Sequence, residues 1–233
     1  MDCGSPIWNS EGVQGDAEVW ELTGPNVYIG RAFTPNHHGP GRFRGGSAWE
    51  SLWVVRGSRF VHVTLSSSGA HNGGIFHKGL FGGYPAPGWK CLWARGVNLK
   101  EIAERDERIP SSVNEAEAML KDGRLKAEDW YCGPLNTWSP NLSDGDLFGV
   151  MYSSGPGYGD PIEREHARIE KDLANGLITP NFARKAYGYA KSETKTEENR
   201  AKIRKRRLEE SVPASQWWRA ERKRARVGDV GKV

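Results

Sequence analysis

The sequence predicts an α+β fold, in which a β-rich body of hairpins and short strands is followed by helices and a basic, helical or disordered tail. Two patterns support this class. Up to residue 152, runs of β-branched and aromatic residues alternate with turns rich in Gly and Pro, which is typical of strands and hairpins. From Asp160 onward, caps and apolar residues at helical spacing replace that pattern.

Two hairpins and two single strands make up the predicted body. In both hairpins, apolar and polar side chains alternate on either side of a two-residue turn, Gly-Pro in the first and Arg-Gly in the second. Shorter apolar runs predict the single strands. The hairpins are expected at residues 17–34 and 47–68, and the strands at residues 89–93 and 147–152.

Three helices are predicted from their ends. The first begins at Ser111 or Ser112 and ends before Gly123, and a Glu three residues beyond the cap completes its starting signal. The second begins at Asp160-Pro161 and ends at Asn175-Gly176, with Ile162, His166, Ile169 and Leu173 on one face. The third extends from Thr179-Pro180 to Gly188.

Charge divides the chain into three parts. Residues 191–233 contain 14 Lys and Arg against 7 Asp and Glu, whereas the preceding residues contain 19 basic and 22 acidic side chains. We therefore expect a β-rich body at residues 1–160, two short helices at 161–190, and a basic, partner-contacting tail at 191–233. A nucleic-acid-binding tail is the alternative, but interleaved acidic residues favour a solvated or partner-clamping helix.

Cysteine usage and hydropathy indicate a soluble protein of the cytoplasm. The three Cys, at positions 3, 91 and 132, include no CxxC pair, and their odd number argues against a disulfide framework. The sequence shows no secretory signal and no run of about 18 apolar residues. No contact with a membrane is expected.

The stretch SSGPGYGDPIERE, residues 153–165, permits two interpretations. Its glycines precede a helix, so free amides there could bind phosphate or another anion. However, carboxylates already occupy the helix start, and the Gly-Lys-Ser/Thr ending of a P-loop is absent. The pattern therefore favours a structural turn and cap, made by Gly155, Gly157, Gly159, Asp160 and Glu163.

The loop HHGPGRFRGG, residues 37–46, contains the candidate contact residues. Arg42 and Arg44 flank one Phe, so in an extended segment both guanidinium groups point to one side and could grasp a carboxylate or phosphate. Alternatively, they tie down a turn against a partner's acidic surface. His37 and His38 are further candidates for anion or partner contact, but they have no carboxylate at ligand spacing, so no metal site is predicted.

No catalytic residue can be assigned from the sequence. A Gly-x-Ser-x-Gly elbow is absent, which argues against a Ser-His-Asp hydrolase. His166 lies on the apolar face of a predicted helix, where a buried structural histidine is expected.

In their order, these motifs resemble the hydantoinase B/oxoprolinase family. The resemblance rests on GPGRFRGG, KGLFGGYPAPG, LSDGDLF, SSGPGYGDPIER and DLANGLITPNFARKAYG, and it covers residues 17–190. AEVWEL, residues 28–31 and the many tryptophans are similar to acetone and acetophenone carboxylase alpha-type subunits. Family members are several times longer, so the chain resembles their C-terminal region.

The resemblance implies one subunit of an ATP-dependent ketone carboxylase, inactive alone. A hydantoinase A-like subunit would bind ATP, and another chain would supply the N-terminal hydantoinase B portion. ATP, Mg and a divalent metal such as Mn or Zn are implied for the complex, which would use bicarbonate and a ketone; none is expected on this chain alone.

Two other functions remain open. One is a component of an ATP-dependent hydantoinase or oxoprolinase amidohydrolase, which would hydrolyse cyclic amides without bicarbonate. The other is a non-catalytic assembly or nucleic-acid-binding module that uses the tail, although nucleic acid is the less favoured partner.

Overall fold

A computed structural model of the chain describes residues 16–63, 78–134 and 141–224. The chain divides into two compact units, Met1–Tyr187 and Gly188–Val233. We call the first the body and the second the C-terminal unit. Each is described separately below.

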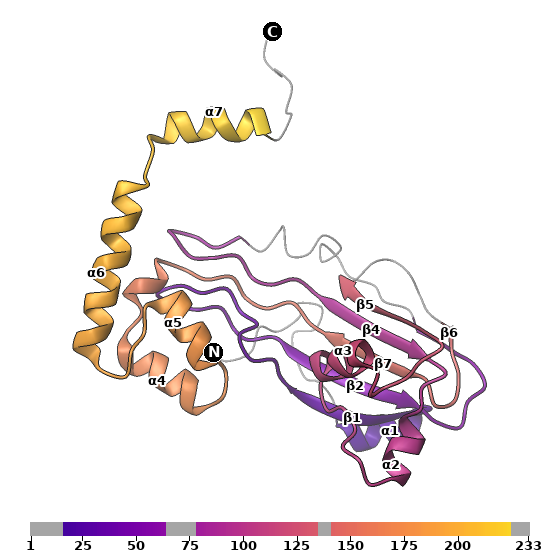
Figure 1. Cartoon of the computed structure of the whole chain (residues 1–233). Helices are drawn as coiled ribbons and strands as arrows, with labels where there is room; N and C mark the ends of the chain where they lie inside the picture. The colour runs from indigo at the N-terminus through magenta and orange to yellow at the C-terminus, as the bar shows by residue number, and fades with distance from the viewer. Residues whose placement is uncertain (1–15, 64–77, 135–140, 225–233) are drawn as a thin grey trace. The chain divides into compact units, whose positions relative to one another are not determined.

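A five-stranded antiparallel sheet forms the centre of the body (Figure 1). The strand order is β1-β2-β7-β4-β5. Both single strands that the sequence predicts are present, as β4 and β7, and the α+β class is confirmed. The strands are β1 (Asn26–Phe33), β2 (Trp49–Val55), β4 (Lys90–Arg95), β5 (Asp129–Pro134) and β7 (Leu147–Met151).

Side chains alternate between the two faces of the sheet. Leu52, Leu92 and Leu147 contribute to a core on one face, under α2 (Leu99–Glu104) and α3 (Val113–Asp122). The helix α3 begins and ends as predicted, because Ser112 Oγ accepts a hydrogen bond from Glu115 N at 3.1 Å and Gly123 has a φ of +81°.

The opposite face of the sheet is rich in aromatic rings. Trp53 and Phe148 come from adjacent strands, and their ring centroids are 4.7 Å apart. A two-stranded ribbon of β3 (Val61–His62) and β6 (Asn141–Leu142) contributes Leu142 to this second core. Because β7 is buried on both faces, all five of its side-chain positions are buried.

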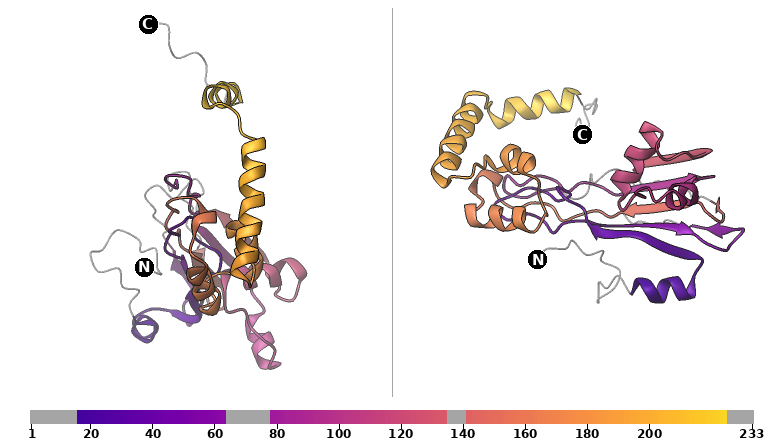
Figure 2. Two further views of the ribbon diagram at one scale, coloured as in Figure 1. Left: turned by 90° about the vertical axis from the view of Figure 1, so that its left-hand side faces the viewer. Right: turned by 60° about the horizontal axis from the view of Figure 1, so that its bottom comes forward.

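The first predicted hairpin is half wrong, since residues 17–23 form a helix. The helix α1 (Ala17–Thr23) begins at Asp16, whose carboxylate accepts a hydrogen bond from Glu18 N at 3.0 Å. It lies outside the sheet, beside the end of β1 (Figure 2, right). Seven residues are too few to separate a two-residue from a 3.6-residue period, so the cap decided the outcome.

The second predicted hairpin is also wrong in its pairing. The strand β2 pairs with β1 and β7, whereas β3 pairs with β6. Residues 64–68 of the predicted hairpin lie outside the described residues. The strand β7, about 90 residues further along the chain, occupies the edge of β2 that a hairpin partner would need.

The predicted helix from Asp160 to Asn175 is interrupted. A short 3-10 helix, η1 (Pro161–Glu163), is followed by extended backbone at Arg164 and Glu165 before α4 (His166–Ala174) begins. The next helix, α5 (Pro180–Tyr187), has the predicted bounds, and Thr179 Oγ1 accepts a hydrogen bond from Phe182 N at 3.3 Å.

The C-terminal unit contains α6 (Glu193–Glu209) and α7 (Ala214–Arg224). Thr196 is fully buried, and its hydroxyl donates to Ala190 O at 2.9 Å, which fixes the start of α6 against the preceding turn. Within the described residues, no helix is long and apolar enough to span a bilayer.

Candidate functional site

Three glycine-rich segments that are far apart in the sequence meet at one place in the body. They comprise residues 37–46, 79–84 and 154–160, and we call this place the glycine-loop cluster. The segments run side by side between the sheet and the helices α4 and α5 (Figures 1 and 2). The cluster contains nearly all of the residues that the sequence analysis selected.

Backbone hydrogen bonds connect the three segments. Between the first and third, Gly39 N donates to Gly155 O at 2.9 Å, and Phe43 and Tyr158 exchange two bonds of 2.9 Å. Between the second and third, Gly157 N donates to Tyr84 O at 2.9 Å and Gly159 N donates to Leu80 O at 2.9 Å. These bonds satisfy the main chain where no regular sheet exists.

The segments approach so closely that side chains are excluded between them. A Cβ atom added to Gly45 would overlap the carbonyl group of Gly155, and one added to Gly157 would overlap the carbonyl oxygen of Pro40. The glycines in SSGPGYGD therefore allow backbone to pack on backbone.

The amides of this segment are directed to the chain itself. The N–H groups of Gly155, Gly157 and Gly159 all donate to backbone carbonyls of the other two segments. Asp160 caps η1 by accepting from Ile162 N at 3.1 Å, and Glu163 N donates to Asp160 O at 3.0 Å. This geometry supports the turn-and-cap interpretation rather than an amide cradle for phosphate.

A buried ion-pair triad ties the cluster to α4. Arg44 binds Asp172 in bidentate fashion, with Nε–Oδ2 and Nη2–Oδ1 distances of 2.9 Å. Arg164 donates to Oδ2 of the same carboxylate at 2.7 Å. The side chains of all three are only 5–6% exposed. Arg44 and Arg164 also donate to Gly45 O and Arg42 O, so the triad holds the loop backbone directly.

The arginines keep Asp172 ionised. Burial acts to raise the pKa of this carboxyl, but the hydrogen bonds and charges of Arg44 and Arg164 outweigh burial, so its pKa lies below the usual value. Two cations face one anion, and a bidentate guanidinium is the geometry that best compensates a desolvated carboxylate.

His38 extends this network toward α5. Its Nε2 lies 3.1 Å from the hydroxyl of Tyr187, whose ring is in turn 5.7 Å from the guanidinium carbon of Arg164. Burial, followed by the charge of Arg44, lowers the pKa of His38 to about 3. Burial also raises the pKa of Tyr187. At neutral pH both groups are therefore uncharged.

The structure separates the four candidate contact residues. His38 and Arg44 are buried and bind groups of the chain itself, and His37 is half-buried with its Nε2 3.1 Å from Gly88 O. Arg42 is different, because its side chain is 55% exposed and its ion pair with Glu163 is long, at 3.9 Å. Arg42 is thus the one of the four whose position suits contact with an anion or partner.

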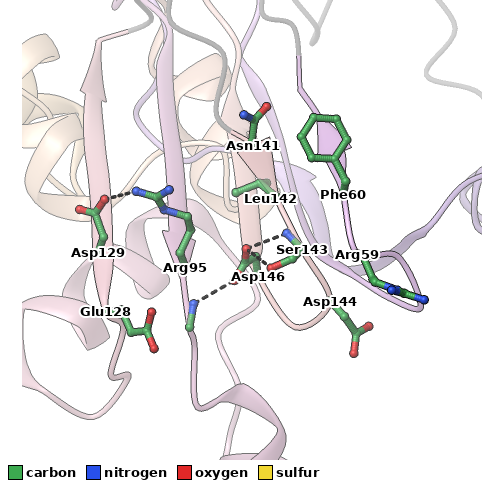
Figure 3. A pocket seen from close by; sticks show the side chains of 11 residues that line it. Arg59, Phe60, Arg95, Glu128, Asp129, Asn141, Leu142, Ser143, Asp144 and Asp146 are labelled. Atoms are coloured by element: carbon green, nitrogen blue, oxygen red, sulfur yellow. Dashed lines mark hydrogen bonds and ion pairs between the residues drawn. The ribbon is translucent and has the colours of Figure 1, made fainter.

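A separate hollow of about 690 Å³ lies beside the β3–β6 ribbon (Figure 3). Asp146 organises it by accepting from Gly96 N at 2.8 Å and from Ser143 N at 2.8 Å, and Arg95 pairs with Asp129 across two strands. These bonds hold turns of the body, and they give this hollow a structural explanation.

The described residues do not fit the divalent metal that the resemblance implies for a complex. Nowhere in residues 16–63, 78–134 and 141–224 do three or more His, Cys, Asp or Glu lie close enough together to hold an ion. Burial raises the pKa of the Cys91 thiol to about 11 and that of Cys132 to about 12, so neither is a thiolate ligand or nucleophile at neutral pH. No metal-dependent step is assigned to this chain.

The sequence analysis missed Asp172, Arg164 and Tyr187. A signal existed for Asp172, which lies three residues after the buried Ile169 and therefore on the inward face of α4. A carboxylate at such a position needs a cation, but the sequence does not indicate which of many arginines provides it.

The fold and the cluster define an α+β chain whose polar centre is built from its own loops and helices. Residues 1–161 match the model of the family described as hydantoinase B/oxoprolinase. The chain belongs to this family, as its motifs indicated.

Two curated relatives are longer proteins. The chain is 36% identical to the acetone carboxylase alpha subunit of Xanthobacter autotrophicus over 241 residues, covering 97% of this chain and 30% of that subunit. It is 30% identical to the acetophenone carboxylase delta subunit of Aromatoleum aromaticum, covering 64% of this chain and 21% of that subunit. The chain thus spans less than a third of the length of either relative.

Solved structures show the same relation. A nucleotide-free structure of acetone carboxylase matches with a TM-score of 0.76 and 34% identity, covering 98% of this chain and 31% of that one. The ATP-dependent caprolactamase from Pseudomonas jessenii matches with a TM-score of 0.53 and 19% identity, covering 80% of this chain and 28% of that one. The second match shows the fold alone.

Proposed function

We propose that this chain forms the C-terminal part of a hydantoinase B-type subunit in an ATP-dependent ketone carboxylase. The observation that carries the proposal is the 36% identity to the acetone carboxylase alpha subunit over 97% of this chain. That share includes the glycine-loop cluster and the helices α4 and α5. The runner-up, an ATP-dependent amidohydrolase, is supported by a likeness at 19% identity, which concerns the fold.

In this proposal the chain acts as a framework rather than as the centre of the reaction. The buried triad of Arg44, Asp172 and Arg164 is suited to hold loops rigidly, because each donor and acceptor is fixed by at least one partner. ATP, Mg and a divalent metal such as Mn or Zn would belong to other parts of the complex. A hydantoinase A-like subunit would bind ATP, and the remaining hydantoinase B polypeptide would complete the subunit.

Activity is therefore expected only from the assembled complex. The complex is purified from its own cells through a tag on this chain, and ATP hydrolysis is measured with a ketone and bicarbonate. Consumption of ketone that requires both ATP and bicarbonate supports the proposal. ATP-dependent hydrolysis of a hydantoin, 5-oxoproline or a lactam without bicarbonate would replace it with the runner-up. Salt-sensitive DNA binding that is lost on removal of residues 191–233 would favour a nucleic-acid module.

Arg42→Ala tests the remaining contact candidate. Because Arg42 is exposed and its ion pair with Glu163 is long, we expect a change of at most about 0.5 kcal/mol in the free energy of unfolding. If Arg42 contacts a partner or an anion, the complex should form more weakly or turn over more slowly, by about tenfold. Normal assembly and turnover of the variant would remove Arg42 from this role. The paired change at Arg44 is unsuitable, since that residue is buried in the triad.

A further inference from the structure

Five large side chains on the glycine-loop cluster point into solvent. In a folded chain, single exposed apolar residues are ordinary, but a group of them on one feature is not. The most exposed is Phe81, at 78%. The members of this group, which we call the aromatic surface, are Phe43, Leu80, Phe81, Tyr84 and Tyr158.

The aromatic surface is continuous. The ring of Tyr158 lies at its centre, 5.2 Å from the ring of Phe81 and 6.3 Å from that of Phe43. Leu80 and Phe43 each form a β-bridge with Tyr158. Tyr84 N donates to Pro40 O at 2.8 Å, which attaches the last member to the same backbone. All three glycine-rich segments therefore contribute to one apolar surface.

The backbone at Phe81 is strained in a way that displays its ring. Gly83 N donates to Leu80 O at 3.0 Å, and Phe81 and Gly82 have φ angles of +50° and +89°. These are the features of a type I′ turn, in which Asn-Gly is the preferred central pair. A Phe at its first central position has unfavourable sterics and gains no burial in return. Strain of this kind commonly accompanies a functional requirement.

Arginines border the aromatic surface. The guanidinium carbons of Arg42 and Arg168 lie 5.7 and 5.6 Å from the centroid of the Phe43 ring. Aromatic residues and arginine are the types enriched at the energetic centres of protein–protein interfaces. The composition therefore fits a polypeptide partner.

We propose that the aromatic surface is where the remaining polypeptide of the hydantoinase B-type subunit docks, with Phe81 as its anchor. The inference rests on the proposed function. Its support is length: the matched region is only 30% of the acetone carboxylase alpha subunit, so more than two thirds of such a subunit lies outside the region described by this chain. A subunit of that size requires a contact surface on this region, and the aromatic surface has the exposed area and composition for it.

The variant Phe81→Asn separates docking from folding. It creates Asn-Gly at a type I′ turn, so the isolated chain should keep its melting temperature or gain a few degrees, whereas the anchor ring is lost. Phe60→Asn is the matched control, because Phe60 is also largely exposed, at 64%, but lies at the hollow beside β3.

The tagged full chain and both variants are expressed in the native cells, and the hydantoinase B-type polypeptide that accompanies each is identified and quantified by mass spectrometry. We expect Phe81→Asn to reduce its recovery at least tenfold and Phe60→Asn to leave it unchanged. Equal recovery with Phe81→Asn would overturn the docking site and leave the proposed function intact. If wild-type chain recovers no such polypeptide, the proposed function fails, and the docking site fails with it.

Two other occupants would be recognised with the isolated chain. If Phe81→Asn lowers the melting temperature by several degrees, the ring packs against another segment of this chain, and the proposal is wrong. If the wild-type chain dimerises in sedimentation experiments and Phe81→Asn abolishes the dimer, the surface belongs to a second copy, which also overturns the proposal.

Discussion

The sheet and the glycine-loop cluster are held together by different forces. In the sheet, two layers of apolar and aromatic side chains pack on either face, and the backbone follows a regular ladder. In the cluster, backbone packs directly on backbone, and one buried carboxylate between two arginines replaces the apolar core. The sheet should therefore tolerate changes of shape, whereas the cluster should fail when a single atom is added or a single charge is removed.

Adding one methyl group to the cluster should have the largest effect. In Gly45→Ala the new Cβ would overlap the backbone of Gly155, which cannot move without breaking the segment pairing. We expect a loss of about 4 kcal/mol or more in the free energy of unfolding, measured by urea denaturation.

Two controls give this prediction its meaning. Gly57 has a φ of +71° and nothing near its Cβ position, so Gly57→Ala should cost only about 1–2 kcal/mol of backbone strain. Leu52→Val in the sheet core should cost about 1 kcal/mol, because it removes a single methylene group. A Gly45→Ala variant as stable as Gly57→Ala would show that the segments can move apart, and the contrast with the sheet would be lost.

Removing the charge of Asp172 should have the next largest effect. Asp172→Asn leaves Arg44 and Arg164 buried without their anion, for which we expect a loss of about 3 kcal/mol or more in the free energy of unfolding. Asp129→Asn breaks an exposed pair with Arg95 and should change stability by less than about 1 kcal/mol. Similar effects for the two variants would mean that the triad contributes no more than a surface ion pair.

The effect of pH follows from His38. In the unfolded chain its imidazole takes up a proton below pH 6.5, whereas in the fold it stays neutral until about pH 3. The unfolded state therefore binds more protons in this window, so acidification should destabilise the body. Between pH 6.5 and 5 the loss is about 2 kcal/mol. Asp172 adds nothing to this window, because its pKa is already below that of an unfolded aspartate and its contribution is lost only at lower pH.

His38→Gln should remove most of this pH dependence, because an amide can still bond the Tyr187 hydroxyl but does not titrate. The free energy of unfolding is measured at pH 6.5 and 5 for both proteins. Some slope should remain from His37, whose pKa burial also lowers. His62→Gln, at an exposed position, is the control. An unchanged slope in His38→Gln would mean that His38 does not remain neutral in the fold.

The difference between the two regions also explains what the sequence could predict. Local signals located α3, α5, β4 and β7, because caps and apolar runs act within a few residues. The pairing of β2 with β7 and the helical state of residues 17–23 depended on long-range contacts or on a single cap. In the cluster, the glycines and Arg44 were visible as motifs, but the partner of Arg44 lies 128 residues further along the chain. Nothing local selects Asp172 over other carboxylates.

The position of β7 has a consequence for synthesis of the chain. This strand is the last of the five in the sequence, but it lies between β2 and β4 and joins the two halves of the sheet. While the ribosome is still making residues 1–146, the pairs β1–β2 and β4–β5 have no direct link, and each exposes a strand edge. The sheet can close only after Met151 has left the exit tunnel, so early nascent chains depend on a late, long-range step that makes them vulnerable to aggregation.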